Sequence, residues 1–288
     1  MRWMTALIAA VCAMSMAAAA AEDQSAKKQR LLFLSKSEGF EHDVIKQKKG
    51  KPSTVDKALT ALAEKNNWEI TCTKDASLVN PEGLKNFDVV IFYTTGDLTK
   101  PSKDGGAAMP ENGLDALFGW IKGGGGFVGY HSATDTFHGA GGEVHPYIQM
   151  IGGEFDTHGQ QFKGRLKPVS PGHPAMEGMP ADWVVADEWY INKNINTADM
   201  HVLALLELGE ERANQPEKYN IPDYPIIWCR GFGDGRVLYN GMGHRDDVWE
   251  SEDFQKVVTS NILWASGKGE LQADPNYEAV VPKSIPGK

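Results

Sequence analysis

The amino-acid sequence predicts an α/β fold, in which a parallel β-sheet carries helices on both faces. Short apolar runs that end in polar residues alternate with longer amphipathic patterns through the first half of the chain. The composition, 41% hydrophobic and 23% charged, is that of a globular protein. At 288 residues the chain is long enough to bury a large core without disulfide staples.

The first half of the chain is expected to alternate strands with helices. A helix over 53–67 follows a Ser or Thr cap and places apolar residues on one face, and a second helix over 111–124 ends in glycine. The predicted strands are the apolar runs at 30–37, 68–73, 88–95 and 127–131.

The second half is richer in strands, which are predicted at 162–170, 201–208, 224–232 and 236–243. The turn "FGDGR" joins the last two as a hairpin, since Asp-Gly favours a tight reversal. A closing helix over 251–267 begins at a serine cap and ends in glycine. These elements form a single domain over 28–268, and we expect the proline-rich tail over 269–288 to be extended.

Residues 1–21 have the pattern of a secretory signal peptide. A charged start precedes a short apolar run and then small residues, with cleavage expected near Ala21. The run is too short for a membrane span, which needs roughly 20 apolar residues. The mature protein is therefore expected to be exported, periplasmic or secreted. Its two remaining cysteines, Cys72 and Cys229, are either a single disulfide or buried free thiols.

Charge and motifs limit the partners. The net charge is -9 and no basic block is present, which argues against nucleic acid or an anionic membrane surface as the main partner. The glycine run "GGGG" precedes a strand instead of following one, and no Gly-Lys-Ser/Thr occurs, so we expect no nucleotide cofactor.

Polar residues follow three of the predicted parallel strands. They lie in "SEGFEHD", "TTGDLT" and "HSATD". Ligands of such sheets bind beyond the carboxyl ends of the strands, where these turns meet. We therefore expect His42, Asp97, His131 and Asp135 to converge, although they are far apart in the sequence.

Histidines and carboxylates recur near these turns. His158 follows Asp156 in "GGEFDTH", and His244 follows the last predicted strand. Imidazole with carboxylate is the ligand set of zinc and other first-row metals. None of the spacings matches a fixed motif such as HExxH, so a divalent metal remains a prediction from composition alone.

A further stretch, "ADEWYINKN", sets carboxylates beside aromatic rings. Asp187, Glu188 and Tyr190 suit a sugar, because the ring stacks on its face and the oxygens bind its hydroxyls. A strand edge with a solvated acidic pair is the alternative. The turn "GYHSA" lacks the glycine pattern G-x-S-x-G, so Ser132 fits a helix cap better than a nucleophile.

Six blocks come in the order seen in trehalose-utilisation (ThuA-like) proteins: "SEGFEHD", "GGGGFVGYHSATDTF", "IGGEFDTH", "HPAMEGMPADWVVADEWY", "PIIWCRGFGDGRVLYNGMGH" and "NILWASG". The sequence resembles this family over about residues 30–268. The resemblance implies a flavodoxin-like parallel sheet of the class I glutamine amidotransferase-like group. The amidotransferase cysteine is replaced by His131 and Ser132 in the matching turn, so amidotransferase chemistry is not expected.

The resemblance also implies catabolism of trehalose and other disaccharides through 3-keto-glycosides. A ketone at sugar C3 acidifies the C2 proton, which permits cleavage by elimination and then hydration. A separate sugar 3-oxidoreductase would make such a substrate. On this hypothesis His131, His244 and Asp135 are the catalytic candidates. The metal ligands are His42, His131 and His158, and the substrate-binding residues are Asp187, Glu188, Tyr190 and Asp97.

The chain departs from the family pattern at "GQQ" after His158 and at the insertion "ERANQPEKYNIPDY". Both changes affect the expected substrate rim. Two other functions stay open at this stage, a keto-sugar isomerase or epimerase and a non-catalytic sugar-binding module.

Overall fold

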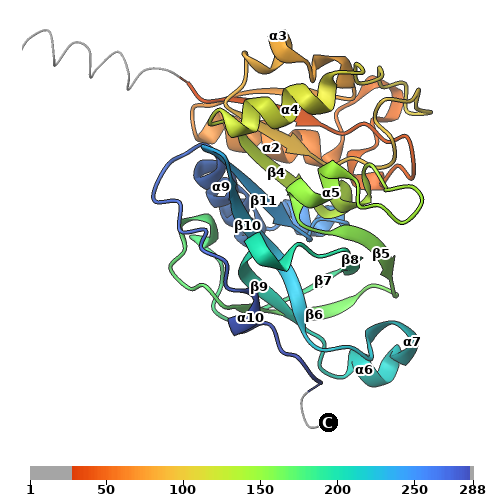
Figure 1. Ribbon diagram of the computed structural model, residues 1–288, viewed down its shortest axis with the longest axis vertical. Coiled ribbons are helices and arrows are strands. Elements are labelled where there is room, and N and C mark those ends of the chain that lie inside the picture. The colour runs from red at the N-terminus through yellow and green to blue at the C-terminus, as the bar shows by residue number, and fades with distance from the viewer. Residues whose placement is uncertain (1–27, 286–288) are drawn as a thin grey trace, which may run out of the picture.

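The computed structural model describes residues 28–285 (Figure 1). Eleven strands are present among these residues: β1 Arg30–Leu34, β2 Glu69–Thr73, β3 Val89–Phe92, β4 Gly126–Tyr130, β5 Glu154–His158, β6 Phe162–Pro168, β7 Trp183–Asp187, β8 Tyr190–Lys193, β9 His201–Glu207, β10 Tyr224–Phe232 and β11 Gly235–Asn240. The helices are α2 Thr54–Lys65, α3 Pro81–Leu84, α4 Gly113–Lys122, α5 Pro146–Ile151, α6 Glu211–Asn214, α7 Pro216–Tyr219, α8 Asp246–Glu250, α9 Glu252–Ala265 and α10 Tyr277–Val280.

Nine strands form one sheet in the order β2-β1-β3-β4-β11-β10-β9-β6-β7. The pairings from β2 to β11 are parallel, and those from β11 to β7 are antiparallel. The prediction of an α/β fold with a parallel sheet and extra strands in the second half is confirmed. The carboxyl ends of the parallel strands β1, β3, β4 and β11 lie along one edge of the sheet. The small two-stranded sheet of β5 and β8 lies beside that edge.

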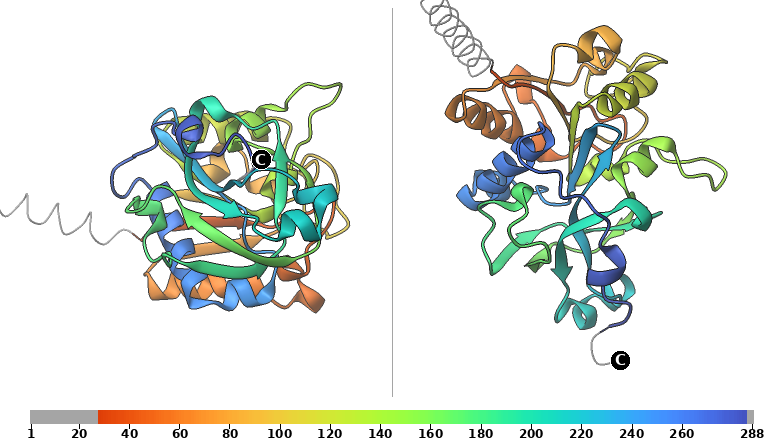
Figure 2. Two further views of the ribbon diagram at one scale, coloured as in Figure 1. Left: turned by 90° about the horizontal axis from the view of Figure 1, so that it is seen from below. Right: turned by 60° about the vertical axis from the view of Figure 1, so that its left-hand side comes forward.

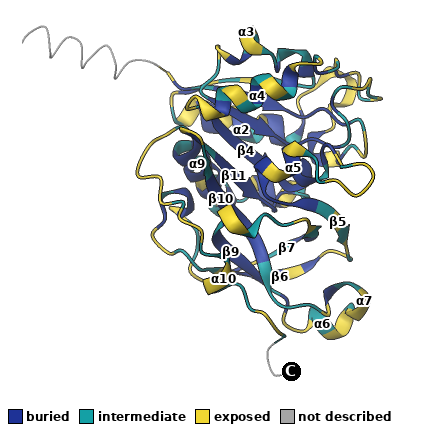
Figure 3. Cartoon of the chain, in the orientation of Figure 1, coloured by how far each residue is buried: buried dark blue, intermediate teal, exposed yellow. Residues whose placement is uncertain are grey.

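Helices cover both faces of the sheet, as Figure 2 shows. The strands alternate their side chains between two hydrophobic cores because successive residues of a strand point to opposite faces. Leu31 and Phe33 of β1 pack with α2 and α9 on one face. Leu32 and Leu34 pack with α3, α4 and α5 on the other. The central strands are accordingly buried along their length (Figure 3).

Local sequence signals explain the helices that were predicted. Ser53 caps α2 with a complete capping box, in which its hydroxyl accepts from Asp56 N and the Asp56 carboxylate accepts from Ser53 N. Ser251 caps α9 through its hydroxyl, which accepts from Phe254 N. The hairpin between β10 and β11 forms around Gly233, whose φ of 66° suits a tight turn.

Three strands were not predicted: β5, β7 and β8. Each mixes buried with partly or fully exposed residues, unlike the uniformly buried central strands. β5 and β8 pair only with each other, and β7 is the outermost strand of the large sheet. A strand at an edge needs only one partner and one buried face, so its sequence carries a weaker signal.

The predicted signal peptide, residues 1–21, lies outside the described residues. The tail is not extended throughout, because α10 interrupts it at Tyr277–Val280. Cys72 and Cys229 are free thiols, so the disulfide alternative is wrong. Within residues 28–285 no helix is long and apolar enough to cross a membrane.

Candidate functional site

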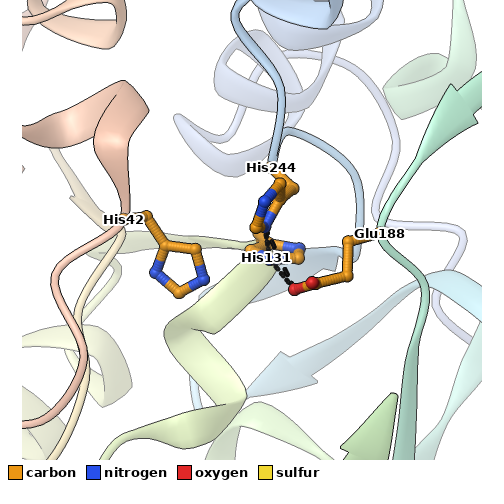
Figure 4. A group of neighbouring side chains, drawn as sticks. All are labelled: His42, His131, Glu188 and His244. Carbon is orange, nitrogen blue, oxygen red and sulfur yellow. Dashed lines mark hydrogen bonds and ion pairs between the residues drawn. The ribbon is translucent and has the colours of Figure 1, made fainter. Parts of the chain in front are cut away.

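Four side chains converge at the carboxyl edge of the parallel strands: His42, His131, Glu188 and His244 (Figure 4). One nitrogen or carboxylate oxygen from each lies within 4.8 Å of the others. His42 and Glu188 approach from opposite sides of the pair formed by His131 and His244. We call these four residues the histidine cluster.

Topology brings the histidine cluster together. His42 follows β1, His131 follows β4 and His244 follows β11, and these strands run parallel with β3 between the first two. Glu188 comes from the short connection between β7 and β8. His131 has a φ of 41°, a left-handed conformation that is uncommon for a residue other than glycine. Such strained residues concentrate at functional sites.

The contacts within the cluster are close. The Glu188 Oε2 atom lies 3.0 Å from His244 Nδ1 and 3.4 Å from His131 Nε2. The two imidazole nitrogens lie 3.3 Å apart. His131 Nδ1 is 3.2 Å from the Gly241 carbonyl oxygen, and a carbonyl only accepts, so Nδ1 carries the proton and Nε2 presents its lone pair to the cluster. This is the arrangement of a histidine that binds a metal.

The charges of the cluster also favour a cation. Burial raises the pKa of Glu188, but the His131 and His244 rings beside its carboxylate outweigh that effect and hold the pKa of Glu188 well below its usual value. Burial, with the neighbouring imidazoles, lowers the pKa of His42 well below its usual value. An ionised carboxylate and a neutral imidazole are the protonation states that metal ligands need.

Asp187 holds the backbone of the residues that carry Glu188 and His244. Its side chain has no exposed surface, and its two oxygens accept from the backbone N–H groups of Glu188, Gly243 and His244 at 3.0, 2.7 and 3.1 Å. Burial raises the pKa of Asp187. A buried carboxylate with three backbone donors is not accessible to a hydroxyl, so the structure does not support the prediction that Asp187 binds a sugar.

Tyr190 and His158 line the cluster on the β5–β8 side. The Tyr190 hydroxyl is 3.2 Å from His42 Nε2, and its ring centroid is 4.2 Å from that of His131. His158 lies outside the four-residue group, but its Nδ1 is 3.3 Å from Glu188 Oε1 and 2.8 Å from the Gly159 carbonyl oxygen. Its side chain is 41% exposed, so it faces the solvent side of the site.

Asp135 and Asp97 make other contacts. Asp135 accepts from His138 Nε2 at 2.6 Å, and His138 Nδ1 donates to Glu154 at 2.8 Å. The hydrogen bond to Asp135 is the main cause that raises the pKa of His138 to about 9. Asp97 accepts from the backbone and the hydroxyl of Thr99. Neither aspartate belongs to the histidine cluster.

One residue at the mouth of the site was missed by the sequence reasoning. Phe40 is 67% exposed, and its ring centroid is 5.0 Å from that of His42. The Phe40 carbonyl accepts from the Thr95 hydroxyl, so the exposed ring sits on a fixed backbone. A lone Phe in a polar loop has no pattern that would reveal it. Its exposure is visible only in the fold.

Comparisons with known proteins agree with this architecture. The model of the family described as trehalose utilisation (ThuA) matches residues 30–265. A ThuA-like protein from Bacteroides uniformis shares 21% identity at a TM-score of 0.63, over 87% of this chain and 96% of that chain. A ThuA-like protein from Parabacteroides merdae shares 14% identity at a TM-score of 0.61, over 83% and 90%.

A third solved structure, described as a cytoplasmic protein from Salmonella typhimurium, has 12% identity and a TM-score of 0.50, over 82% of this chain and 98% of that one. At these identities the structures show a common fold alone. No match was found among curated proteins. The family model covers most of the chain and the sheet carries the expected topology, so this protein belongs to the ThuA family of trehalose utilisation.

Proposed function

We propose that this protein is an exported, metal-dependent enzyme that cleaves 3-keto-glycosides, disaccharides such as 3-keto-trehalose among them. Membership in the ThuA family supports a role in sugar catabolism. The observation that carries the enzymatic part is the convergence of three imidazoles and one ionised carboxylate within 4.8 Å. A module that only stacks and hydrogen-bonds sugars does not require such a cluster.

The histidine cluster fits a divalent first-row ion such as zinc. His42, His131, His244 and Glu188 would hold it, and the N–H of His131 toward Gly241 O fixes the tautomer that this requires. Such an ion supplies a Lewis acid for the C3 ketone oxygen. In this proposal Glu188 and His244 take the place of His158, which the sequence predicted as a ligand.

His158 is the best-placed general base. Its Nδ1 proton is engaged by the Gly159 carbonyl at 2.8 Å, which leaves Nε2 as the basic nitrogen. Nε2 takes the proton from sugar C2, the C2–H electron pair forms a C1–C2 double bond, and the C1–O bond breaks. The protonated His158 returns a proton to the leaving oxygen. Water then adds across the double bond, its oxygen to C1 and a proton to C2.

This chemistry requires an earlier reaction that makes the substrate. The C3 ketone must be made by a separate oxidoreductase that removes two electrons from the C3 alcohol. The signal-peptide pattern of residues 1–21 supports a site of action outside the cytoplasm.

A product assay tests the proposal. The protein is incubated with 3-keto-trehalose in deuterated water, and the products are followed by NMR. We expect glucose and 3-keto-glucose in equal amounts, with deuterium at C2 of the ketose. An intact disaccharide with inverted configuration at C2 would instead indicate an epimerase, and one with a migrated carbonyl group an isomerase.

A further inference from the structure

A hollow of about 440 Å³ opens beside the histidine cluster, and His244 forms part of both. Its volume lies within the range of small-molecule sites, roughly 300–1,000 Å³. The His244 side chain is 22% exposed, whereas that of His131 is fully buried. The cluster is therefore accessible from the His244 side, and a substrate that reaches it has room to extend into this hollow.

Carboxylates dominate the wall of the hollow. Asp43, Asp246, Asp247 and Glu250 all line it. Arg245 is the one lysine or arginine in the lining, and its guanidinium forms two hydrogen bonds with Asp247, at 2.8 and 2.9 Å. Lys46 lies 3.9 Å from Asp43 and offsets part of its charge. The excess negative charge therefore rests mainly on Asp246 and Glu250, which are both exposed on α8.

The same wall carries several hydrogen-bonding groups. Arg245 also donates to the Gln161 side-chain oxygen at 2.9 Å, so guanidinium, amide and carboxylate groups are held together across α8 and the loop before β6. Groups of this kind bind the vicinal hydroxyls of a sugar, which donate to carboxylates and accept from guanidinium. Gln161 belongs to "GQQ", where the sequence departs from the family pattern.

We propose that this hollow is the leaving-group subsite, which accepts a neutral or cationic, hydroxyl-bearing group and rejects an anionic one. The inference rests on the proposed function and adds a substrate class to it: uncharged 3-keto-disaccharides and amino sugars are favoured, and phosphorylated or acidic ones are disfavoured. Wall charges of the same sign as the ligand repel it, and this repulsion makes the subsite selective.

Three matched 3-keto-glucosides test this. Each carries the same aryl alcohol as leaving group, with a remote neutral amide, carboxylate or trimethylammonium substituent. We expect kcat/KM for the anionic compound to be roughly fivefold below that for the neutral one at low salt, from two charges about 8 Å away in water. In 0.5 M salt the kcat/KM values of the anionic and neutral compounds should become nearly equal, because the Debye length is then only about 4 Å.

Variants locate the effect. In the double variant D246N/E250Q the kcat/KM of the neutral compound divided by that of the anionic one should fall toward one at low salt, and in the double variant D246K/E250K it should fall below one. D115N, which removes a carboxylate from α4, serves as the matched control and should leave the ratio unchanged.

Equal turnover of the three compounds, or a preference that survives D246N/E250Q, would overturn the inference and leave the proposed function standing. No turnover of any compound by the folded wild-type protein would overturn the proposed function, and the subsite with it.

Discussion

His131 combines a left-handed backbone with a fully buried ring, and each of these features costs folding free energy. A φ of 41° costs on the order of 1–3 kcal/mol for a residue with a Cβ. The Tyr239 hydroxyl donates to the His131 carbonyl at 2.7 Å and helps to hold this conformation. The ring is thereby fixed against His42, His244 and Tyr190.

The variant H131A tests whether this ring binds a metal. We expect loss of stoichiometric metal after dialysis and a fall in turnover of at least ~100-fold, because one of four ligands is missing. Metal content is measured by elemental analysis of the folded protein. H201Q is the control, since His201 begins β9 at the far end of the sheet from the cluster. Metal content equal in H131A and H201Q would contradict the assignment.

His158 should behave differently from the ligands. In H158Q we expect metal content to stay near that of the wild type while turnover falls by about 10²–10⁴-fold, the range for loss of a general base. Exchange of the C2 proton with deuterium, followed by NMR, should slow in parallel. If H158Q loses its metal together with its activity, then His158 is a ligand, as the sequence first suggested.

At the scale of single residues, the sequence identified the histidines but not their partners. His42, His131 and His244 were predicted because they follow strands that the apolar pattern reveals. Glu188 was predicted for a sugar and not for the cluster, since its position depends on the unpredicted pairing of β8 with β5. Asp187 precedes it by one residue and points to the other side, a difference that no local pattern reports.

Among the secondary-structure elements, the loop after β11 depends on its connection to β7. Asp187 ends β7 and binds the backbone of Gly243 and His244, and the Gly243 carbonyl accepts from Trp249 Nε1 at 2.8 Å and from the Tyr93 hydroxyl at 3.1 Å. Gly243 has a φ of 109°, which other residues rarely adopt. These contacts determine where His244 lies.

We predict that D187N weakens metal binding, although Asp187 is not itself one of the four ligands. An amide places an N–H group against a backbone donor, so one of the three hydrogen bonds is lost at a cost of about 1–3 kcal/mol. We expect a lower free energy of unfolding by this amount in urea and a metal affinity reduced about 10- to 100-fold. D115N is again a suitable control. Unchanged metal affinity in D187N would show that the loop does not need this carboxylate.

A second element-level prediction concerns the tail and its dependence on pH. His173 Nδ1 accepts from Ala175 N at 3.1 Å, and its Nε2 donates to the Gln272 carbonyl in the tail at 3.2 Å. The bond from Ala175 needs the neutral ring, because a protonated Nδ1 cannot accept a hydrogen bond. Burial, with the neighbouring His201, lowers the pKa of His173 to about 4, from 6.5.

The sign of the effect follows from linkage. Below pH 6.5 the unfolded chain takes up the proton first, so the stability that His173 contributes is complete above that pH and is lost as the pH falls to about 4. The loss is on the order of 3 kcal/mol. In H173N the free energy of unfolding, measured in urea, should decline less between pH 6.5 and pH 4. Parallel pH profiles for the two proteins would contradict this.

At the scale of the whole molecule, the fold was more predictable than the site. Strands such as β1, β3, β4 and β11 are buried on both faces, so their apolar runs are continuous and easily recognised. The order β2-β1-β3-β4 is that of a flavodoxin-like sheet, as the family resemblance implied, and it brings His42 to His131. The strands β5, β7 and β8 have mixed exposure, and these strands with their connection supply Glu188, Tyr190 and His158.

The hollow beside His244 arises only at this scale. Its wall combines the loop after β1, the loop before β6 and α8, which are distant in the sequence. The family match ends at residue 265, before the tail that contacts His173 and His201. His173 and His201 do not belong to the histidine cluster, so the two groups of predictions can be tested independently.

The most direct test of the central claim is a metal titration of activity. The purified protein is stripped with a chelator, and zinc, manganese or cobalt is then added back in steps while aglycone release from a chromogenic 3-keto-glucoside is followed. We predict that release is lost on stripping and returns in proportion to bound metal, up to one ion per chain. Release that continues undiminished in the metal-free protein would contradict the account.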